Sequence, residues 1–345
     1  MLLKRLLLLL YLFIWLPGCS EPQPESILRV LTWPGYADPD LVKAFEERYH
    51  VHVEVTFIDT DDDLWAKANQ NESQDFDVLA VNTAELQRYV DSGLSVPIDL
   101  NNIPNTQTQL PRFKDLASIP GIMRGGKIYA IPYTYSTMGL IYNRQMVKSP
   151  PDSMAAMWDQ NYQGKVLAFD ASNHNFSITA LILGIADPFQ LDDEQFTQVQ
   201  RKLVELRRNV LTFYSAPEEA VDLFQNNQIA YIFGNYGSQQ VKQLRDAGAD
   251  IGYVNVKEGT LAWLDCWSVT KGAKDHKLAE TWINYTLEQS VSDALSARQG
   301  LPNTVEPSNL IKSSDKIIWL QPVEDFEKRG QLWQKIRSGD SLQKF

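Results

Sequence analysis

The segment Trp263-Leu264-Asp265-Cys266-Trp267 places one carboxylate between two indole rings. Side chains alternate between the two faces of a β-strand, so Trp263, Asp265 and Trp267 would share one face. A buried carboxylate needs a partner, and a cationic ligand held between aromatic rings supplies one. The spacing therefore indicates a binding site for a cationic ligand.

Three further clusters stand where predicted strands end. They are Thr32-Trp33-Pro34-Gly35-Tyr36, Val81-Asn82-Thr83 and Phe169-Asp170-Ala171-Ser172-Asn173. Open α/β sheets bind ligands beyond the carboxyl ends of their strands, which makes these clusters candidates for the same site. For any single cluster a structural interpretation stays open, because Trp is largely buried on average and Asp is a favoured helix N-cap. All four clusters together favour a binding site.

Local signatures of catalysis are missing from the sequence. It contains no P-loop, GxGxxG, GxSxG, CxxC or HExxH motif. His50 and His52 alternate on one predicted strand, but two such imidazoles are more often bystanders than metal ligands. The acids of 59–63 mimic the start of a calcium loop, yet Leu64 stands where that loop needs glycine, so they are interpreted as the acidic first turn of a helix. We predict a binding protein, not an enzyme, without cofactor or metal.

The composition sets outer limits on size and partners. The chain has 345 residues, of which 44% are hydrophobic, and 32 Lys and Arg against 43 Asp and Glu give a formal charge of −11. This length suggests two domains. The acidic balance argues against nucleic acid, whose binders concentrate Lys and Arg on one face, and it suits a cationic ligand.

Residues 1–18 have the order of a secretory signal peptide. Lys4 and Arg5 precede an unbroken apolar run of eleven residues, 6–16. The run is shorter than the roughly 20 residues that an ordinary membrane-spanning helix needs. A cleaved signal is therefore predicted, with an uncleaved signal anchor as the alternative.

The stretch Leu16-Pro17-Gly18-Cys19 resembles the bacterial lipobox, in which a cysteine receives lipid and becomes the mature N-terminus. The resemblance predicts Cys19 as the lipid attachment point, with simple cleavage of the signal left open. Residues 19–26 would then form a short tether to the membrane. Cys266 is the other cysteine, so an internal disulfide is not expected, and we predict a small buried side chain there.

Predicted strands and helices alternate along the rest of the chain. Strand candidates include 27–32, 52–58 and 76–81, with helix candidates at 40–49, 61–70 and 84–90. Such alternation builds a mostly parallel sheet with helices on both faces, so the fold class is α/β. The pattern restarts after Asn143, which predicts two α/β modules, and the chain is expected to cross between them near 132–142 and 261–269.

In these clusters the chain resembles the bacterial spermidine/putrescine-binding periplasmic proteins, a branch of the two-lobed solute-binding proteins of ABC transporters. The best-matching stretches are 31–36, 76–83, 129–143, 262–265 and 300–303. The resemblance implies a type II periplasmic fold with a linear polyamine between two hinged lobes. With the predicted crossings, lobe 1 comprises 27–136 plus 264–302, and lobe 2 comprises 137–263 plus 303–345.

The resemblance also implies which residues hold the ligand. Aromatic walls, polar contacts and carboxylates carry over to Trp33, Tyr36, Asn82, Thr83, Asp170, Trp263, Asp265 and Gln321. Asp170 would hold a terminal ammonium and Asp265 an inner or second one. Ala84 and Leu301 stand where the family often has Tyr, and Phe233 replaces a family Trp. These departures predict a differently tuned site and leave the choice among spermidine, norspermidine, putrescine and other cations open.

Two functions follow from such a site. The first is delivery of a polyamine from the periplasm to an ABC permease by a lipid-anchored, monomeric protein. The second is sensing, in which a membrane-bound cyclic-dinucleotide signalling protein recognises the liganded state without transport. A third interpretation stays open, namely a hydrolase or metal-dependent enzyme with a similar fold, or a binder of another solute.

Overall fold

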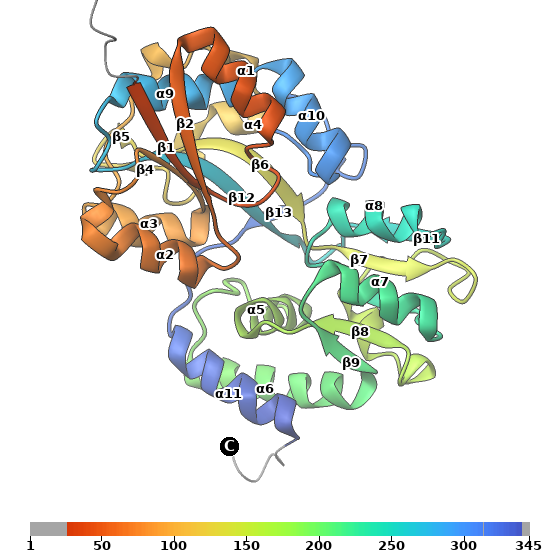
Figure 1. Cartoon of the computed structure of the whole chain (residues 1–345). Helices are drawn as coiled ribbons and strands as arrows, with labels where there is room; N and C mark the ends of the chain where they lie inside the picture. Colours follow the sequence, from red (N-terminus) through yellow and green to blue (C-terminus); the bar gives the residue numbers. More distant parts are fainter. Residues whose placement is uncertain (1–25, 313, 340–345) are drawn as a thin grey trace, which may run out of the picture.

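Two β-sheets divide the computed structural model into two lobes (Figure 1). The structure describes residues 26–312 and 314–339, so the predicted signal peptide, Cys19 and most of the tether lie outside it. The first sheet contains, in spatial order, β13 (Ile317–Trp319), β12 (Thr260–Val269), β3 (Val78–Asn82), β1 (Ser26–Thr32) and β2 (Val51–Phe57), and β6 (Ile131–Thr137) also pairs with β12. The second contains β11 (Ile251–Val254), β7 (Leu140–Asn143), β10 (Tyr231–Phe233), β8 (Val166–Phe169) and β9 (Thr212–Tyr214). The predicted two-lobed α/β fold is confirmed.

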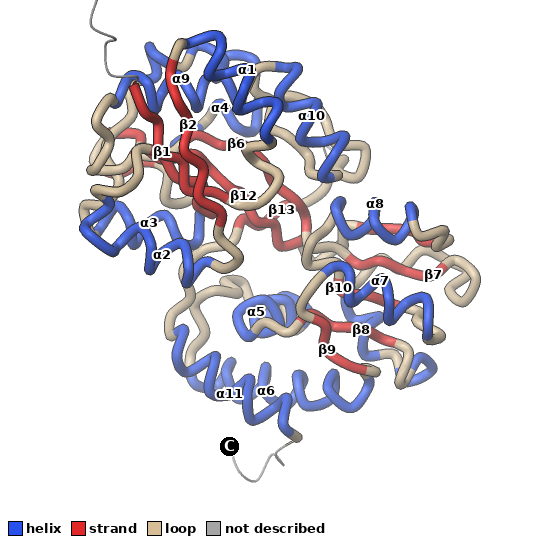
Figure 2. Tube along the Cα trace, viewed as in Figure 1, coloured by secondary structure: helices blue, strands red, loops and turns tan. Residues whose placement is uncertain are grey.

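Helices cover both faces of the first sheet (Figure 2). Strand β1 shows the reason, because Leu28 and Val30 enter one core while Leu31 enters the other. One face is covered by α1 (Pro39–Tyr49), α9 (His276–Thr286) and α10 (Gln289–Gln299), and the other by α2 (Asp61–Asn69) and α3 (Thr83–Asp91). The short helix α4 (Pro111–Lys114) and the hairpin of β4 (Met123–Arg124) and β5 (Lys127–Ile128) complete this lobe.

The second sheet is built in the same way. Val166 and Ala168 of β8 enter the core under α5 (Ser172–Ile182), α6 (Asp193–Asn209) and α11 (Phe326–Ser338). Leu167 enters the opposite core under α7 (Pro217–Asn226) and α8 (Ser238–Asp246). Within 26–312 and 314–339, no helix is long and apolar enough to cross a membrane.

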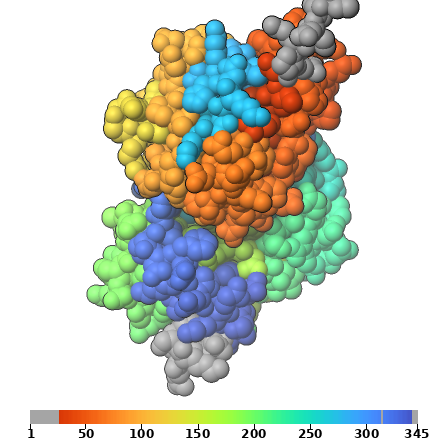
Figure 3. Space-filling view, turned by 60° about the vertical axis from the view of Figure 1, so that its left-hand side comes forward, coloured from red at the N-terminus to blue at the C-terminus, as the bar shows by residue number. Residues whose placement is uncertain are grey.

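The chain crosses between the lobes three times. β6 continues into β7 through Met138 and Gly139, and 255–259 lead from β11 back to β12. The Tyr253 hydroxyl bonds to both sides of the β6–β7 junction. It donates to the Thr137 carbonyl at 2.6 Å and accepts from the Gly139 amide at 2.9 Å. The third crossing, 320–325, links β13 to α11, which Figure 3 shows as a dark blue surface below the orange part of the first lobe.

Strand pairing places the lobe boundaries differently from the predicted ones. All of β12, from Thr260 onward, belongs to the first sheet, because Ala262 pairs with both Thr137 and Trp319. β13 also joins this sheet, although 303–345 was assigned to lobe 2. Hydrophobic periodicity identifies a strand but not its hydrogen-bonding partner, which explains the difference. Cys266 of β12 is fully buried, as predicted.

Candidate functional site

Asp265 and Tyr36 form the centre of the candidate site. Asp265 lies on β12, only 8% exposed, and its Oδ2 accepts a hydrogen bond of 2.6 Å from the Tyr36 hydroxyl in the turn after β1. The Tyr36 ring packs edge-on against Tyr133, with centroids 5.4 Å apart, which holds the hydroxyl in place. Burial raises the pKa of Asp265 to about 6, and the hydrogen bond from Tyr36 opposes that rise.

The two indoles around Asp265 have different surroundings. Trp267 is fully buried and packs against Tyr133 and Trp282, so it belongs to the core of the first lobe. Trp263 is half-buried and packs against the cores of both lobes, and its Nε1 donates to the Asn235 carbonyl of lobe 2 at 3.3 Å. Of the two rings, only Trp263 therefore bridges the lobes.

Trp33 lies next to Tyr36 in the same turn. The Tyr36 amide donates to the Trp33 carbonyl at 3.3 Å, and the half-buried Trp33 ring packs against both cores of the first lobe. Its indole N–H is buried without a hydrogen-bond partner in the described chain. An unpaired buried donor is costly, so this group is available to a ligand or a water molecule.

Asn82 and Thr83 both make structural hydrogen bonds. Asn82 caps α3, where its Oδ1 accepts from the amides of Ala84 and Glu85. The Thr83 hydroxyl donates to the Leu320 carbonyl at 3.1 Å, at the start of the third crossing. Gln321, the next residue, is exposed. The structure thus brings Asn82 beside Asp265, its direct partner across β3 and β12, while Thr83 ties α3 to the crossing segment.

The structure places Asp170 against helix α11. Its Oδ1 accepts from the Trp333 indole at 2.8 Å, and its Oδ2 pairs with Arg337. A ligand ammonium at Asp170 would have to share these oxygens with α11. The burial and charge of this carboxylate are therefore already compensated within lobe 2.

We expect Asp170→Asn to act mainly through α11. The variant loses the ion pair with Arg337 and should melt at a lower temperature than wild type. It should weaken polyamine binding less than Asp265→Asn does, because Asp265 has no ion-pair partner among the described residues. Thermal unfolding of both variants measures the change in melting temperature, and calorimetric titration measures the change in affinity. An equal loss of affinity in the two variants would support the ligand-binding role that the sequence predicts for Asp170.

Two polar groups near the site were not singled out as site residues by the sequence. Asp61, interpreted as part of an acidic helix turn, does begin α2, but its Oδ1 also accepts from the Asn82 side chain at 2.8 Å. Burial, reinforced by the carboxylates of Glu85 and Asp265, raises the pKa of Asp61 to about 7. The signal available in the sequence was its position directly after the second strand.

His174 is the second such group. Its Nδ1 shares a 2.8 Å hydrogen bond with Asn235 Oδ1, and its ring stacks on Phe169 with centroids 6.0 Å apart. Burial lowers the pKa of His174 to about 4, so the ring is neutral near pH 7. A neutral imidazole does not repel a cation, which makes this surface of lobe 2 compatible with a positively charged ligand.

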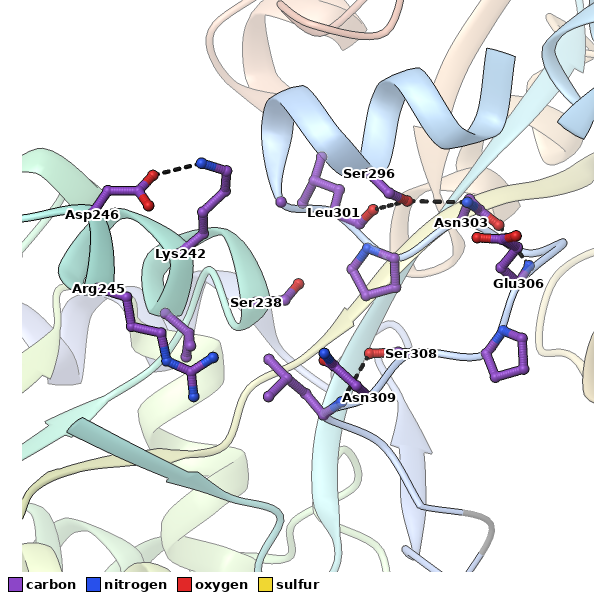
Figure 4. A pocket seen from close by; sticks show the side chains of 15 residues that line it. Ser238, Lys242, Arg245, Asp246, Ser296, Leu301, Asn303, Glu306, Ser308 and Asn309 are labelled. Atoms are coloured by element: carbon purple, nitrogen blue, oxygen red, sulfur yellow. Dashed lines mark hydrogen bonds and ion pairs between the residues drawn. The ribbon is translucent and has the colours of Figure 1, made fainter. Parts of the chain in front are cut away.

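A separate cavity of about 380 Å³ lies between α8 and the segment after α10 (Figure 4). None of the eight predicted ligand residues lines it. Lys242 pairs with Asp246 on its wall at 2.5 Å, and the Lys242 side chain lies against Gly300 of the other lobe. This cavity therefore lies between the two lobes, and the Lys242–Asp246 ion pair compensates part of the charge on its wall.

Two α/β lobes, three crossings and a buried carboxylate beside aromatic rings define a type II periplasmic solute-binding protein. The chain belongs to the bacterial extracellular solute-binding protein family, whose model matches residues 40–316. It is an extracellular or periplasmic binding protein and not an enzyme, as predicted.

Individual relatives are similar to the chain in sequence or in fold. The chain is 26% identical over 275 residues to spermidine/putrescine-binding periplasmic protein 1 of Haemophilus influenzae, covering 79% of this chain and 74% of that protein. It is 24% identical to the putrescine-binding periplasmic protein PotF of Escherichia coli, covering 77% and 75%. A lipoprotein of Treponema pallidum superposes with a TM-score of 0.78 at 17% identity, covering 91% of this chain and 100% of that one. This last likeness shows the fold.

Proposed function

We propose that the protein binds a polyamine between its lobes and delivers it to the membrane permease of an ABC transporter. The observation that carries the proposal is Asp265, a carboxylate more than nine-tenths buried that has a tyrosine hydroxyl but, among the described residues, no cation as partner. A buried carboxylate of this kind is compensated when a cation binds. The relatives named for spermidine and putrescine support a polyamine as that cation.

The chemistry of a polyamine suits the surrounding side chains. Protonated amines alternate with apolar methylenes, so carboxylates and ring faces along a cleft can match the ligand over its length. Trp33 and Tyr36 are the proposed walls of lobe 1, and Trp263 is the wall that reaches lobe 2. Each cation–π contact contributes about 0.5–2 kcal/mol, whereas leaving a buried charge unpaired costs several kcal/mol. The acids should therefore dominate affinity and the rings should dominate shape.

Ligand binding should also draw the lobes together. Trp263 already contacts both cores, and a ligand held by both lobes would favour the closed arrangement by hinge motion. The permease would recognise this closed arrangement. A signalling protein reading the same arrangement is the alternative, and uptake of labelled polyamine by cells with and without the gene separates the two.

The proposal is tested by calorimetric titration of purified protein, refolded to remove carried-over ligand, with spermidine, norspermidine and putrescine. We expect micromolar or tighter binding of at least one. Leu301 and Phe233, where relatives often carry Tyr and Trp, are buried in the two cores, so the order of preference is expected to differ from that of spermidine binders. Absence of heat with all three would overturn the polyamine assignment.

Membrane attachment through Cys19 is part of the same proposal, and this residue lies outside the described range. The matching Treponema pallidum protein is a lipoprotein, which supports it. In cells fed a labelled fatty acid, wild type should take up label and Cys19→Ala should not. Equal labelling of the two would place the lipid elsewhere, and labelling of neither would favour a simply cleaved signal.

A further inference from the structure

Asp61 and Asp265 come from distant parts of the chain and meet at Asn82. Asp265 stands directly opposite Asn82 in the antiparallel pairing of β12 with β3, where opposed Cβ atoms are about 4.5–5.5 Å apart. The Asn82 Nδ2 then donates to Asp61 Oδ1 at 2.8 Å. The two carboxylates are therefore neighbours on either side of a single amide.

Each carboxylate keeps one oxygen without a partner. Tyr36 occupies Oδ2 of Asp265 and Asn82 occupies Oδ1 of Asp61, while the remaining oxygens accept no hydrogen bond from any described residue. Neither acid forms an ion pair within 26–312 and 314–339. Asp265 is nonetheless more than nine-tenths buried, so its free oxygen is an unpaired acceptor inside the site.

The charged groups around the pair do not neutralise it. The titratable groups of this neighbourhood are the neutral Tyr36 hydroxyl, Asp62 on α2, and Glu85 and Arg88 on α3. Arg88 is the cation of this set, but it pairs with Glu85 at 2.7 Å and reaches only the backbone carbonyl of Asp61, at 3.3 Å. The net charge of this neighbourhood is therefore negative whenever both Asp61 and Asp265 are ionised.

We propose that Asp61 and Asp265 together hold one primary ammonium group of the ligand, and that the empty pair retains a proton which the ligand displaces. This inference rests on the proposed polyamine function and names the part of the site that recognises a chain end. A primary ammonium has three N–H donors, so it can satisfy both free oxygens and keep one donor for a further acceptor, whereas both donors of a secondary ammonium would be used by the pair. Hard metal cations require larger oxygen sets, and the described chain has no group of three or more His, Cys, Asp or Glu side chains suited to a metal.

A shared proton makes binding depend on pH. Two neighbouring carboxylates resist simultaneous ionisation, and desolvation together with the nearby acids holds the pKa of Asp61 at about 7. A polyamine stays charged through this range, because alkylammonium groups titrate near pH 10. Protonation of the pair therefore competes with the ligand, and affinity should fall by about tenfold between pH 8 and pH 6 for one displaced proton.

The test is calorimetric titration with spermidine at pH 8 and pH 6, in two buffers of different ionisation heat. Wild type should release close to one proton per ligand at pH 6. Asp61→Asn should bind at least tenfold more weakly at pH 8 and lose most of the pH dependence and proton release. Asp222→Asn, which removes an exposed acid from α7 of the other lobe, should match wild type.

The possible results separate the two proposals. Wild-type binding with Asp61→Asn unchanged in affinity and pH profile would overturn the role of Asp61 and leave the polyamine function standing. No binding of spermidine, norspermidine or putrescine by wild type would overturn both. Thermal melting identifies a misfolded variant, and Asp61→Glu, which keeps the carboxylate, should restore proton release. A folded Asp61→Glu variant without proton release would contradict the shared proton.

Discussion

Asp265→Asn should weaken polyamine binding by about 2–5 kcal/mol, or roughly one and a half to four decades in affinity. The substitution preserves size and leaves the Asn oxygen as an acceptor for the Tyr36 hydroxyl, so the shape of the site is retained. It removes the negative charge and turns the oxygen that would face the ligand into an amide NH2, which donates and cannot accept from an ammonium. Titration calorimetry measures the loss, and an affinity within threefold of wild type would contradict the assignment of Asp265 to the ligand.

The same substitution should stabilise the unliganded protein. Burial raises the pKa of Asp265 to about 6, above the usual value near 4, so the folded state binds more protons than the unfolded state between these values. Stability from this group is therefore present at low pH and lost as the pH rises toward 6. We expect Asp265→Asn to raise the free energy of unfolding at pH 8 by about 1–3 kcal/mol, with a smaller difference at pH 4.

Urea unfolding at pH 8 and pH 4 measures the expected gain in stability, and titration calorimetry measures the expected loss of affinity. Asp222→Asn is a matched control, because Asp222 is an exposed acid on α7 with no side-chain partner among the described hydrogen bonds. The control should change neither the free energy of unfolding nor the affinity for the polyamine. Loss of both stability and binding in Asp265→Asn would indicate a structural role instead.

Arg329→Met should destabilise the protein by about 3–5 kcal/mol, because it leaves a mostly buried acid without its partner. Arg329 on α11 is fully buried and forms two hydrogen bonds with Glu324, at 2.9 and 2.8 Å. It also donates to Ser177 Oγ at 2.9 Å and to the Pro188 carbonyl at 3.0 Å. One side chain thus fastens α11, and with it the end of the third crossing, onto α5 and the segment after it.

Denaturant unfolding measures the loss, with Arg201→Met on the exposed face of α6 as a control that should stay within about 0.5 kcal/mol of wild type. The double variant Arg329→Met with Glu324→Gln should recover part of the stability, since it removes the stranded charge. A loss below about 1 kcal/mol in the single variant would show that α11 is held by its apolar face, through Trp333 and Ile336, and not by the ion pair.

Local patterns were sufficient to predict the fold class, and they selected the candidate site. Alternating strand and helix signals predicted two α/β modules, and the 263–267 spacing placed an acid on the same strand face as two rings. Both features depend on periodicities of a few residues, which a sequence displays directly. The spacing did not distinguish the two rings. Trp267 lies in the core of the first lobe, and of the two rings only Trp263 reaches the second lobe.

The sequence by itself determined which residues are able to meet a cation, namely a carboxylate among aromatic rings after predicted strands. Only the tertiary structure decided which of them are free to do so. Asp170 follows β8 and Asp61 begins α2 after β2, yet Asp170 bonds to side chains of α11 while Asp61 lies beside Asp265. The physical reason is that a side chain's partners come from distant segments, as for Tyr36 and Asp265, which lie 229 residues apart, and strand pairing and helix packing bring such segments together only in the folded chain.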